Sequence, residues 1–167
     1  YPSQSFTLLN ATGYVVAQRK AAVASKATGR VEWLGVTEGS RVTEGEIIAR
    51  LENMDVSATM EQAAANVRVA KANLQQGQAE LIDAEAAFNR NGELLAKGFI
   101  SQFAHDIATA RFRKAQAAVL GYQASVGAAE ANYRAARIAV EQTLIRAPFD
   151  GVVLTKSANV GDVITPF

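Results

Sequence analysis

Two seven-residue apolar repeats in the central part of the chain place the strongest constraint on its fold. The first repeat carries a large apolar residue at every seventh position: Met60, Val67, Leu74, Leu81, Phe88 and Leu95. The second repeat does the same with Phe112, Val119, Val126, Tyr133 and Val140. Further residues, most of them Ala or Gly, lie three positions after the large ones, and an apolar spacing that alternates three and four is typical of a coiled coil.

The residue numbers of the two repeats predict how they pair. The numbers of Phe88 and Phe112 add up to 200, and the other large positions give the same sum back to Met60 and Val140. The intermediate positions, such as Gly77 and Tyr122, add up to 199. A constant sum indicates an antiparallel pair, so we expect a helical hairpin over residues 53–143 with its tip near 97–101. Arms of this length reach roughly 65 Å at 1.5 Å per residue.

Residues near the ends of both arms are suited to ending helices. Asn53 or Asp55 is expected to cap the first helix. Lys97 followed by Gly98 is typical of a helix C-terminus. Ser101 is expected to be the N-cap of the second helix. The connection between the two helices is therefore predicted to be very short.

The segments on either side of the hairpin, residues 6–51 and 144–167, have β character and repeat each other. The run Gly29-Arg30-Val31 is followed ten residues later by Gly39, and Gly151-Val152-Val153 is followed ten residues later by Gly161. The offset between the two copies is 122 residues. Chance agreement of glycine and valine is the alternative to a duplicated strand-turn-strand unit. We expect an α+β fold, with the hairpin inserted into a split β sandwich whose core includes Trp33 and Phe149.

Composition argues against several classes of function. The net charge is +1, from 17 basic and 16 acidic residues, so no general attraction for nucleic acid is predicted. The chain has no cysteine, and His105 is its only histidine. We therefore predict no catalytic residues, no metal site and no cofactor. The chain starts at Tyr1 without Met, lacks a long apolar run and shows no signal peptide, so it is interpreted as a mature or trimmed product.

The tip departs from the repeat. Asn91 occupies a position where the repeat favours a small apolar residue, and Gly92 lies inside a helix at a cost of about 1 kcal/mol. Phe99, Ile100 and Phe103 place apolar side chains at the end of a thin rod, where little protein can cover them. One or two of them are expected only to fill the turn. As a group they predict a docking surface.

The tip also carries a spaced motif that resembles a known family. Arg90, Leu94 and Ser101 are similar in type and spacing to the tip motif of the periplasmic adaptor proteins, also called membrane fusion proteins, which include HlyD-like and RND- or MacA-type efflux subunits. "LLAKGFISQ" resembles their tip loop, and "TLIRAPFDGVV" resembles their strand leaving the hairpin. "KATGRVEWLGVTEGSRVTEGEIIARLE" is similar to their first half-lipoyl segment.

This resemblance implies an organisation and a role. The β base would be a biotinyl/lipoyl-like module, with residues 21–52 as its first half and 144–167 as its second. Residues 1–20 would include the lead-in strand from a β-barrel domain that this chain does not contain. The family resemblance implies a periplasmic location at the inner membrane of a Gram-negative bacterium and a homo-oligomer, either trimer or hexamer.

The resemblance also implies partners. The tip residues Arg90, Leu94 and Ser101 would dock onto a TolC-type outer-membrane channel, together with the tip turn at Gly98 and the three apolar residues. An inner-membrane RND or ABC transporter would contact domains outside this chain. The pump class and the cargo are left open by the sequence.

Three other classes of protein are alternatives to an adaptor. A lipoyl or biotinyl carrier needs a lysine at the turn between its β halves, but "RLENMDVS" and "TLIRAP" at the two junctions contain none, and Lys26 lies well before them. A purely structural coiled coil would have no channel partner. A hydrolase is disfavoured by the lone histidine, and "TEGSRVTEG" is not a phosphate-binding loop because no helix and lysine follow it.

Overall fold

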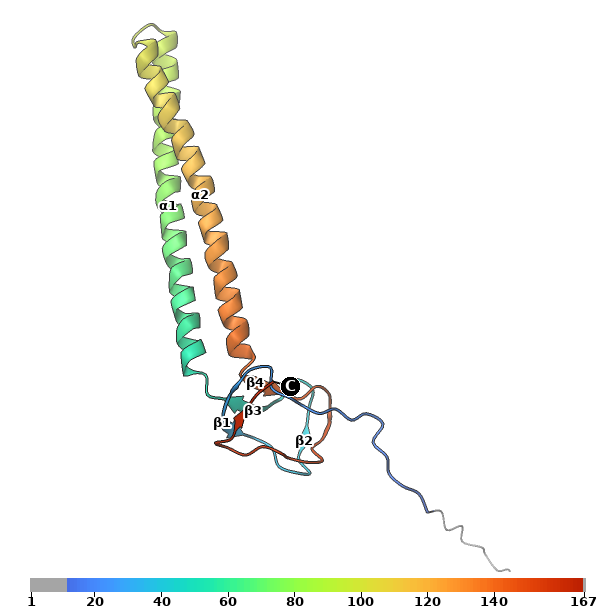
Figure 1. Cartoon of the computed structure of the whole chain (residues 1–167). Coiled ribbons are helices and arrows are strands. Elements are labelled where there is room, and N and C mark those ends of the chain that lie inside the picture. The colour runs from blue at the N-terminus through green and yellow to red at the C-terminus, as the bar shows by residue number, and fades with distance from the viewer. Residues whose placement is uncertain (1–11, 167) are drawn as a thin grey trace, which may run out of the picture.

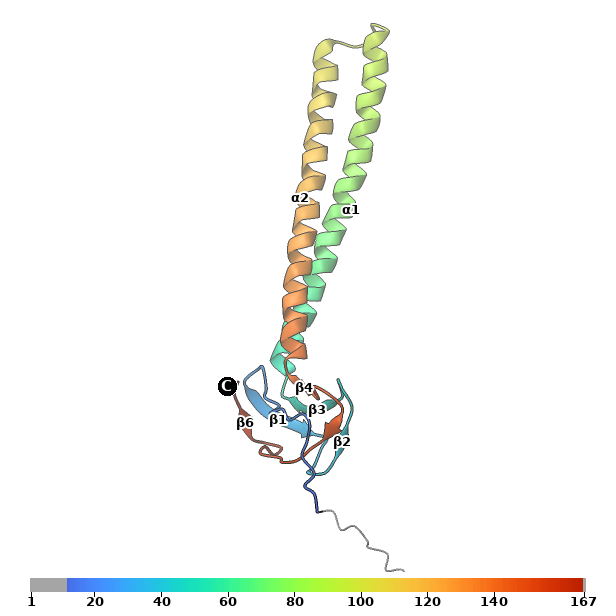
Figure 2. The ribbon, with the colours of Figure 1, turned by 90° about the vertical axis from the view of Figure 1, so that its right-hand side faces the viewer.

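The computed structural model describes residues 12–166 and divides them into a small β base and a long helical hairpin (Figures 1 and 2). The base is built from β1 (Gly29–Leu34), β2 (Arg41–Val42), β3 (Ile47–Leu51), β4 (Leu144–Arg146), β5 (Gly151–Val152) and β6 (Val163–Ile164). The hairpin consists of α1 (Met54–Ala96) and α2 (Gln102–Glu141). The predicted fold class, a long hairpin inserted between two β segments, is confirmed.

The two β segments are interleaved in the base. One sheet has the strand order β4-β3-β1-β6, and the other pairs β2 with β5, all antiparallel. Each sheet therefore contains strands from before and after the hairpin. Because both sheets combine strands from the two segments, the base holds the two ends of the hairpin side by side.

The 122-residue repeat is visible in the backbone hydrogen bonds. Val31 N–H donates to the Asp162 carbonyl at 2.8 Å, and Val153 N–H donates to the Ser40 carbonyl at 2.9 Å. The reverse bonds also match, since Gly161 N–H donates to the Val31 carbonyl and Gly39 N–H donates to the Val153 carbonyl. Each of these bonds has its counterpart 122 residues away, so the predicted duplication is an internal two-fold relationship.

The core of the base is small. Val31 and Leu51 are almost completely buried, and Ala49 and Ala147 are buried beside them. The expectation that Trp33 belongs to this core is wrong, because its side chain is 43% exposed. The Trp33 ring lies against Gly35 instead, where an added Cβ would come within 2.2 Å of the ring.

Phe149, the other aromatic residue expected in the core, is half-buried. The guanidinium carbon of Arg19 lies 4.9 Å from the centre of its ring. The ring is therefore covered on one side by a cation rather than by apolar core residues.

The segment before β1 differs from the expectation. Residues 12–28 contain no strand, although β structure was expected within 6–51, and Tyr14 and Val15 are fully exposed. The physical reason is that both edges of β1 are already paired, one with β3 and one with β6. The expected lead-in strand within residues 1–20 is thus absent from 12–20, while residues 1–11 lie outside the described residues.

The helices pair as the residue numbers predict. The rings of Phe88 and Phe112 stack with their centres 5.1 Å apart. The Tyr122 ring lies over Gly77, so closely that an added Cβ would be 2.5 Å from Cδ2 of Tyr122. The two helices run side by side from the base to the tip (Figures 1 and 2). By the helical rise, α1 with its 43 residues is roughly 65 Å long.

Small residues form the buried line of the hairpin. The small side chains that are buried between the helices are Ala63, Gly77, Ala84, Ala108, Ala115 and Ala136. The larger residues of the repeat are half-buried, apart from Val119, which is buried. Because the small residues let the two backbones approach, the large ones extend sideways over the line of contact.

Two ion pairs cross between the helices on opposite sides of this line. Lys71 Nζ lies 3.1 Å from a carboxylate oxygen of Glu130. Arg111 Nη2 lies 2.9 Å from a carboxylate oxygen of Glu80. Exposed pairs of this kind add little stability, but both fit only the antiparallel register.

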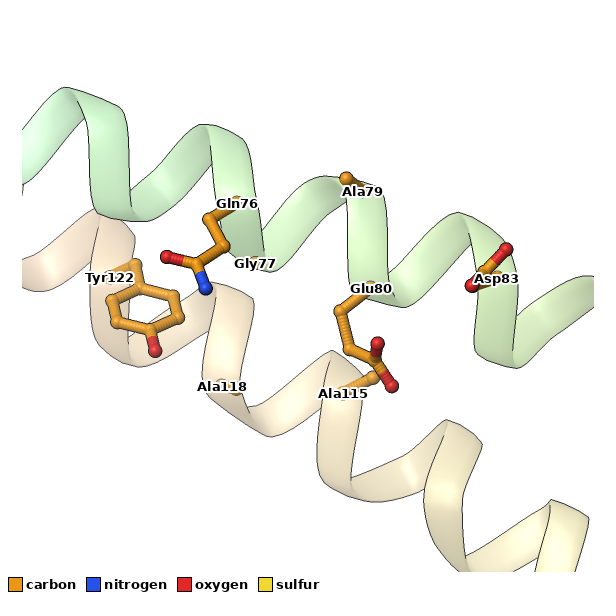
Figure 3. A pocket seen from close by; sticks show the side chains of 8 residues that line it. All are labelled: Gln76, Gly77, Ala79, Glu80, Asp83, Ala115, Ala118 and Tyr122. Carbon is orange, nitrogen blue, oxygen red and sulfur yellow. The ribbon is translucent and has the colours of Figure 1, made fainter.

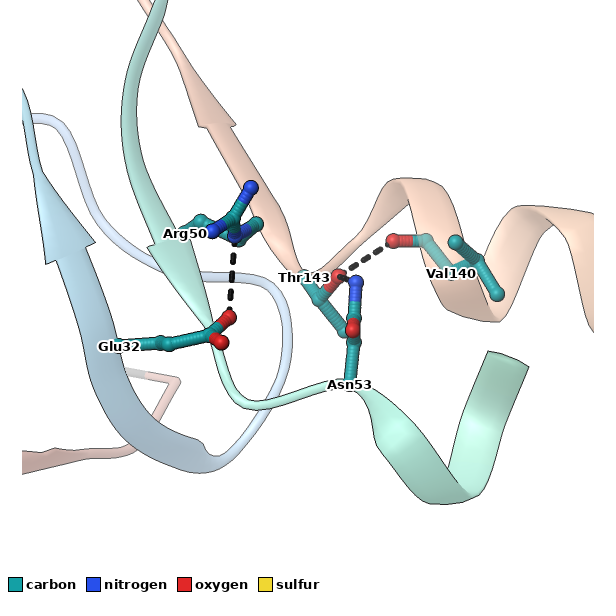
Figure 4. A network of polar contacts seen from close by, with 5 residues as sticks. All are labelled: Glu32, Arg50, Asn53, Val140 and Thr143. Atoms are coloured by element: carbon teal, nitrogen blue, oxygen red, sulfur yellow. Dashed lines mark hydrogen bonds and ion pairs between the residues drawn. The ribbon is translucent and has the colours of Figure 1, made fainter. Parts of the chain in front are cut away.

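The ends of the hairpin meet at a polar contact (Figure 4). Asn53 stands at the N-cap position of α1, but its side chain makes no capping hydrogen bond. Its Nδ2 instead lies 3.5 Å from Oγ1 of Thr143, which donates to the Val140 carbonyl at 2.6 Å. The expected cap is replaced because Asn53 and Thr143 flank the hairpin on either side.

Candidate functional site at the hairpin tip

The turn at the tip is a compact helix ending. Gly98 has φ +76°, a left-handed conformation. Its N–H donates to the Leu95 carbonyl at 3.0 Å, and the N–H of Phe99 donates to the Leu94 carbonyl at 2.9 Å. These two bonds form a Schellman motif, which satisfies carbonyls that would otherwise lack partners. Gly98 therefore fixes the direction in which the chain leaves α1.

Ser101 begins the second helix, as the sequence predicts. Its backbone is extended, and its Oγ accepts a hydrogen bond from the N–H of Ala104 at 3.2 Å. Ser101 remains exposed. Its hydroxyl therefore has one established structural task and can also reach a partner at the surface.

Three apolar side chains are exposed around the turn. Phe99 and Phe103 are both 73% exposed, and Ile107 is 56% exposed. Ile100 is half-buried. Ile107 was not predicted from the sequence, although it lies one helical turn after Phe103 on α2.

Arg90 and Leu94 lie one helical turn apart near the end of α1. Residues four apart share a face of a helix, so both side chains point to the same side. Arg90 is exposed and makes no ion pair within residues 12–166, while Leu94 is half-buried. The structure places Arg90, Leu94 and Ser101 at the same end of the molecule without a hydrogen bond between Arg90 and Ser101.

Three aromatic rings stack on one another next to the tip. The His105 ring lies 5.5 Å from that of Phe88, which in turn stacks on Phe112. The Nδ1 atom of His105 is buried and has no hydrogen-bond partner among the described residues. Gly92 faces this ring, with an added Cβ 3.8 Å from Cε1. The histidine thus packs inside the hairpin, on the line of contact where the repeat predicts it.

An open groove runs along the middle of the hairpin (Figure 3). Its floor is formed by small residues and Tyr122, and Glu80 and Asp83 lie along its rim. Within residues 12–166 no three His, Cys, Asp or Glu side chains gather as a possible metal site. None of the helices in this range is long and apolar enough to span a bilayer. The tip is therefore the strongest candidate site.

A comparison with known protein families finds a match for the hairpin. A family model described as "RND MFP, alpha-helical hairpin domain" matches residues 66–143, a range that includes the whole tip. MFP stands for membrane fusion protein. The match therefore concerns the same part of the chain that carries the proposed docking residues.

Curated relatives extend the similarity beyond the hairpin. The chain is 27% identical over 157 residues to the multidrug resistance protein MdtA of Yersinia pestis (strain Pestoides F), covering 94% of this chain and 32% of that protein. It is 25% identical to MdtA of Pectobacterium atrosepticum, again over 94% of this chain and 35% of the relative. The chain thus spans about a third of the length of the relatives that it matches.

A solved structure shares the fold. The crystal structure of MacA from Actinobacillus actinomycetemcomitans superposes with a TM-score of 0.81 at 21% identity, covering 89% of this chain and 46% of that chain. The hairpin and the β base are therefore arranged alike in the two proteins. Together, the hairpin matches a membrane fusion protein model, the MdtA relatives extend the similarity along most of the chain, and MacA shares the fold.

Proposed function

We propose that this chain is the hairpin and β-base portion of a periplasmic adaptor in a tripartite efflux system. The hairpin projects roughly 65 Å from the base and ends in exposed apolar side chains. The observation that carries the proposal is the combination of a long helical hairpin, which offers only an open groove, with an apolar tip. Such a shape is suited to bridging two partners rather than to catalysis.

The tip supplies complementary means of docking. Phe99 and Phe103 offer apolar area that is already exposed to water, so covering it on docking is favourable. Arg90 offers a forked set of donors for carbonyls or carboxylates at the ends of partner helices. Leu94 adds an apolar contact on the same face as Arg90. Ser101 holds its own helix and adds a hydrogen bond to the partner.

The partner at the tip is, in this proposal, a TolC-type outer-membrane channel. The partner at the other end is an inner-membrane transporter, and the RND class is favoured over the ABC class because the matching hairpin model describes RND adaptors. The transporter contacts would be made by parts of the assembly outside this chain. The site of action would be the periplasm of a Gram-negative bacterium.

Several copies are needed for this role. One hairpin is only two helices wide and encloses no channel. A ring of copies, a trimer or a hexamer, would surround a conduit and present several tips to the channel together. Weak contacts at each tip would then add up through multivalency.

A hybrid protein tests the proposal. This chain would replace the matching segment of Yersinia pestis MdtA in a strain without its own MdtA, and drug resistance would be measured. The hybrid is expected to restore resistance, whereas hybrids with Arg90→Asp or Ser101→Asp are expected to lose it at unchanged protein level and helicity.

A mid-hairpin variant supplies the control. Gln75→Asp adds the same single negative charge as Ser101→Asp, on an exposed side of α1 far from the tip, and it is expected to leave resistance intact. Full resistance in both tip variants would refute tip docking and support the purely structural alternative.

A further inference from the structure

The buried line of the hairpin stops short of the tip. No residue from 85 to 107 is buried, whereas Ala84 and Ala108 on either side of this stretch are. Leu94 and Leu95, the large apolar residues near the end of α1, are only half-buried. Segments with few buried apolar contacts are the ones that open locally at a low free energy.

Three residues in this stretch weaken the contact between the helices: Asn91, Gly92 and His105, which we call the neck. Asn91 is half-buried at a position that is Ala or Gly in the lower part of α1, and a polar residue in the line of contact lowers the stability of a helix pair. Gly92 lowers the stability of a helix interior relative to alanine. The buried Nδ1 atom of His105 has no hydrogen-bond partner among the described residues, so its loss of hydration is not compensated.

Polar contacts between the helices do not reach the neck. Within residues 12–166 they use Lys71, Glu80 and Asp83 on α1, and none uses a residue of α1 after Asp83. Nearer the tip, the side-chain hydrogen bonds stay within α2 and its N-cap, as in the bond from Gln102 to Asp106. The two helices are therefore held together at the neck by half-buried side chains alone.

Well-bonded structure lies on both sides of the neck. On the base side, Phe88 and Phe112 stack with their ring centres 5.1 Å apart. On the tip side, the N–H groups of Gly98 and Phe99 are bonded to carbonyls of α1, and Ser101 caps α2. Because both helix ends at the turn are satisfied, the turn itself is not where opening is expected to begin.

From this arrangement we infer that the tip, defined as residues 93–104, moves as one unit on the neck while its turn stays formed, and that docking requires this movement. The second half of the inference rests on the proposed function. Phe99 and Phe103 stand on a turn whose own geometry is fixed, so they can adjust to a partner only if the whole turn moves. Sequences break packing rules most often at functional sites, and the neck lies next to the docking residues.

Amide hydrogen exchange, followed by NMR on the whole chain, tests the movement. In a helix the N–H groups of Leu94 and Leu95 bond to carbonyls four residues earlier, so these bonds cross the neck. The N–H groups of Gly98 and Phe99 bond within the tip. After correction for intrinsic rates, we expect Leu94 and Leu95 to exchange at least about tenfold faster than Gly98 and Phe99. Equal rates, or the opposite order that fraying from the turn would give, would overturn the inference.

A matched pair of glycine variants shows whether the neck controls this exchange. Gly92 and Gly121 both lie inside helices with room for a methyl group, since an added Cβ meets only His105 at 3.8 Å in the first case and nothing within 4 Å in the second. Gly92→Ala is expected to slow the exchange of Leu94 and Leu95 about two- to five-fold, because alanine stabilises a helix more than glycine does. Gly121→Ala is expected to leave these rates unchanged. Equal slowing by both variants, or none from Gly92→Ala, would contradict the role of the neck.

Drug resistance in the MdtA hybrid tests the link to docking. Gly92→Ala combined with His105→Leu strengthens the neck twice, by adding helix stability and by removing the unpaired nitrogen. The combined variant is expected to lower resistance several-fold at unchanged protein level, and Gly92→Ala alone is expected to lower it less. Gly121→Ala is the control and is expected to keep full resistance. Full resistance in the combined variant despite slowed exchange would show that docking does not require the movement.

A relocated glycine separates mobility from shape. Asn89 is exposed and lies in the same helical turn of α1 as Gly92. Adding Asn89→Gly to Gly92→Ala weakens this turn again without removing the methyl group at position 92. The double variant is expected to regain both fast exchange and resistance relative to Gly92→Ala alone. Fast exchange without regained resistance would mean that the methyl group blocks docking directly, and it would remove the link between movement and docking.

The movement and the proposed function can fail separately. Ser101→Asp is expected to abolish resistance while leaving the exchange of Leu94 and Leu95 fast, because aspartate also caps a helix. The expected exchange order together with fully resistant tip variants would remove tip docking but not the movement. The opposite exchange order together with a sensitive Ser101→Asp hybrid would remove the movement but not tip docking.

Discussion

The guanidinium of Arg146 binds the carboxylate of Glu141, with Nε donating to Oε1 at 2.6 Å. Glu141 is the last residue of α2, and Arg146 is the last residue of β4. The same guanidinium donates through Nη1 to the Gly45 carbonyl at 2.9 Å. Arg146 therefore ties the end of the hairpin to the loop before β3, and it fixes how the rod leaves the base.

The ion pair predicts a dependence on pH. The hydrogen bond that Arg146 donates to the Glu141 carboxylate holds the pKa of Glu141 below its ordinary value of 4.5. A carboxylate whose pKa is lowered on folding stabilises the fold above its unfolded pKa, and this contribution is lost as the pH falls through the folded pKa. Glu141→Gln is expected to lower the melting temperature slightly at pH 7 and to have a smaller effect at pH 3. Circular dichroism melts at both pH values would measure the difference, and an equal effect at both would contradict the ion-pair account.

The glycines near the tip predict effects of opposite sign. Gly98 has φ +76°, so Gly98→Ala is expected to destabilise the protein by about 1 kcal/mol. Gly92 lies inside α1, and an added Cβ would meet only His105 at 3.8 Å. Gly92→Ala is expected to stabilise it by about 0.5–1 kcal/mol. Urea unfolding of both variants measures the free energies, and the same sign for both would refute this reading of the turn.

Close packing of Tyr122 on Gly77 predicts coupling between them. In Gly77→Ala the new Cβ would lie 2.5 Å from the Tyr122 ring, so the ring must move and stability is expected to fall. In a Tyr122→Ala background the same change is expected to stabilise by about 1 kcal/mol through helix propensity. Gly121→Ala, with open space around it, is the control and should stabilise in both backgrounds. Additive effects of the changes at positions 77 and 122 would show that the ring does not pack on Gly77.

The internal repeat predicts paired effects in the base. Gly39 has φ +86° and Gly161 has φ +94°, 122 residues apart. Alanine at either position is expected to cost about 1–2 kcal/mol, because both turns need the left-handed conformation. The two single variants should match each other in thermal melts. A large loss at one position with none at the other would mean that the two halves of the base are not equivalent.

Much of the architecture could be predicted from the sequence because it depends on periodicity. The constant sum of residue numbers paired Phe88 with Phe112 and Gly77 with Tyr122, and the glycine offset located the duplicated turns. Gly98 and Ser101 could be assigned as helix ends because their chemistry is local. These features depend on residues whose conformational needs hardly vary with their surroundings.

The predictions that were wrong concern features that depend on tertiary packing. Residues 12–28 have apolar β-formers but no strand, because β1 has no free edge to pair with them. Trp33 is too large for a core built around Val31 and Leu51, and it lies outside. Asn53 has a nearby alternative partner in Thr143, which no local rule reveals. At the tip, the apolar residues could be identified from the sequence, but the exposure of each side chain depended on how the turn closed.

The most direct test is to identify the protein that the hairpin tip contacts in the cell. A photoreactive side chain would be placed at Phe99 or, as a control, at Ala72 in the MdtA hybrid, and the cells would be irradiated. Docking of the tip predicts an adduct with the outer-membrane channel from position 99, none from position 72, and loss of the adduct when Arg90→Asp is added. No channel adduct at position 99, or equal adducts at both positions, would contradict it.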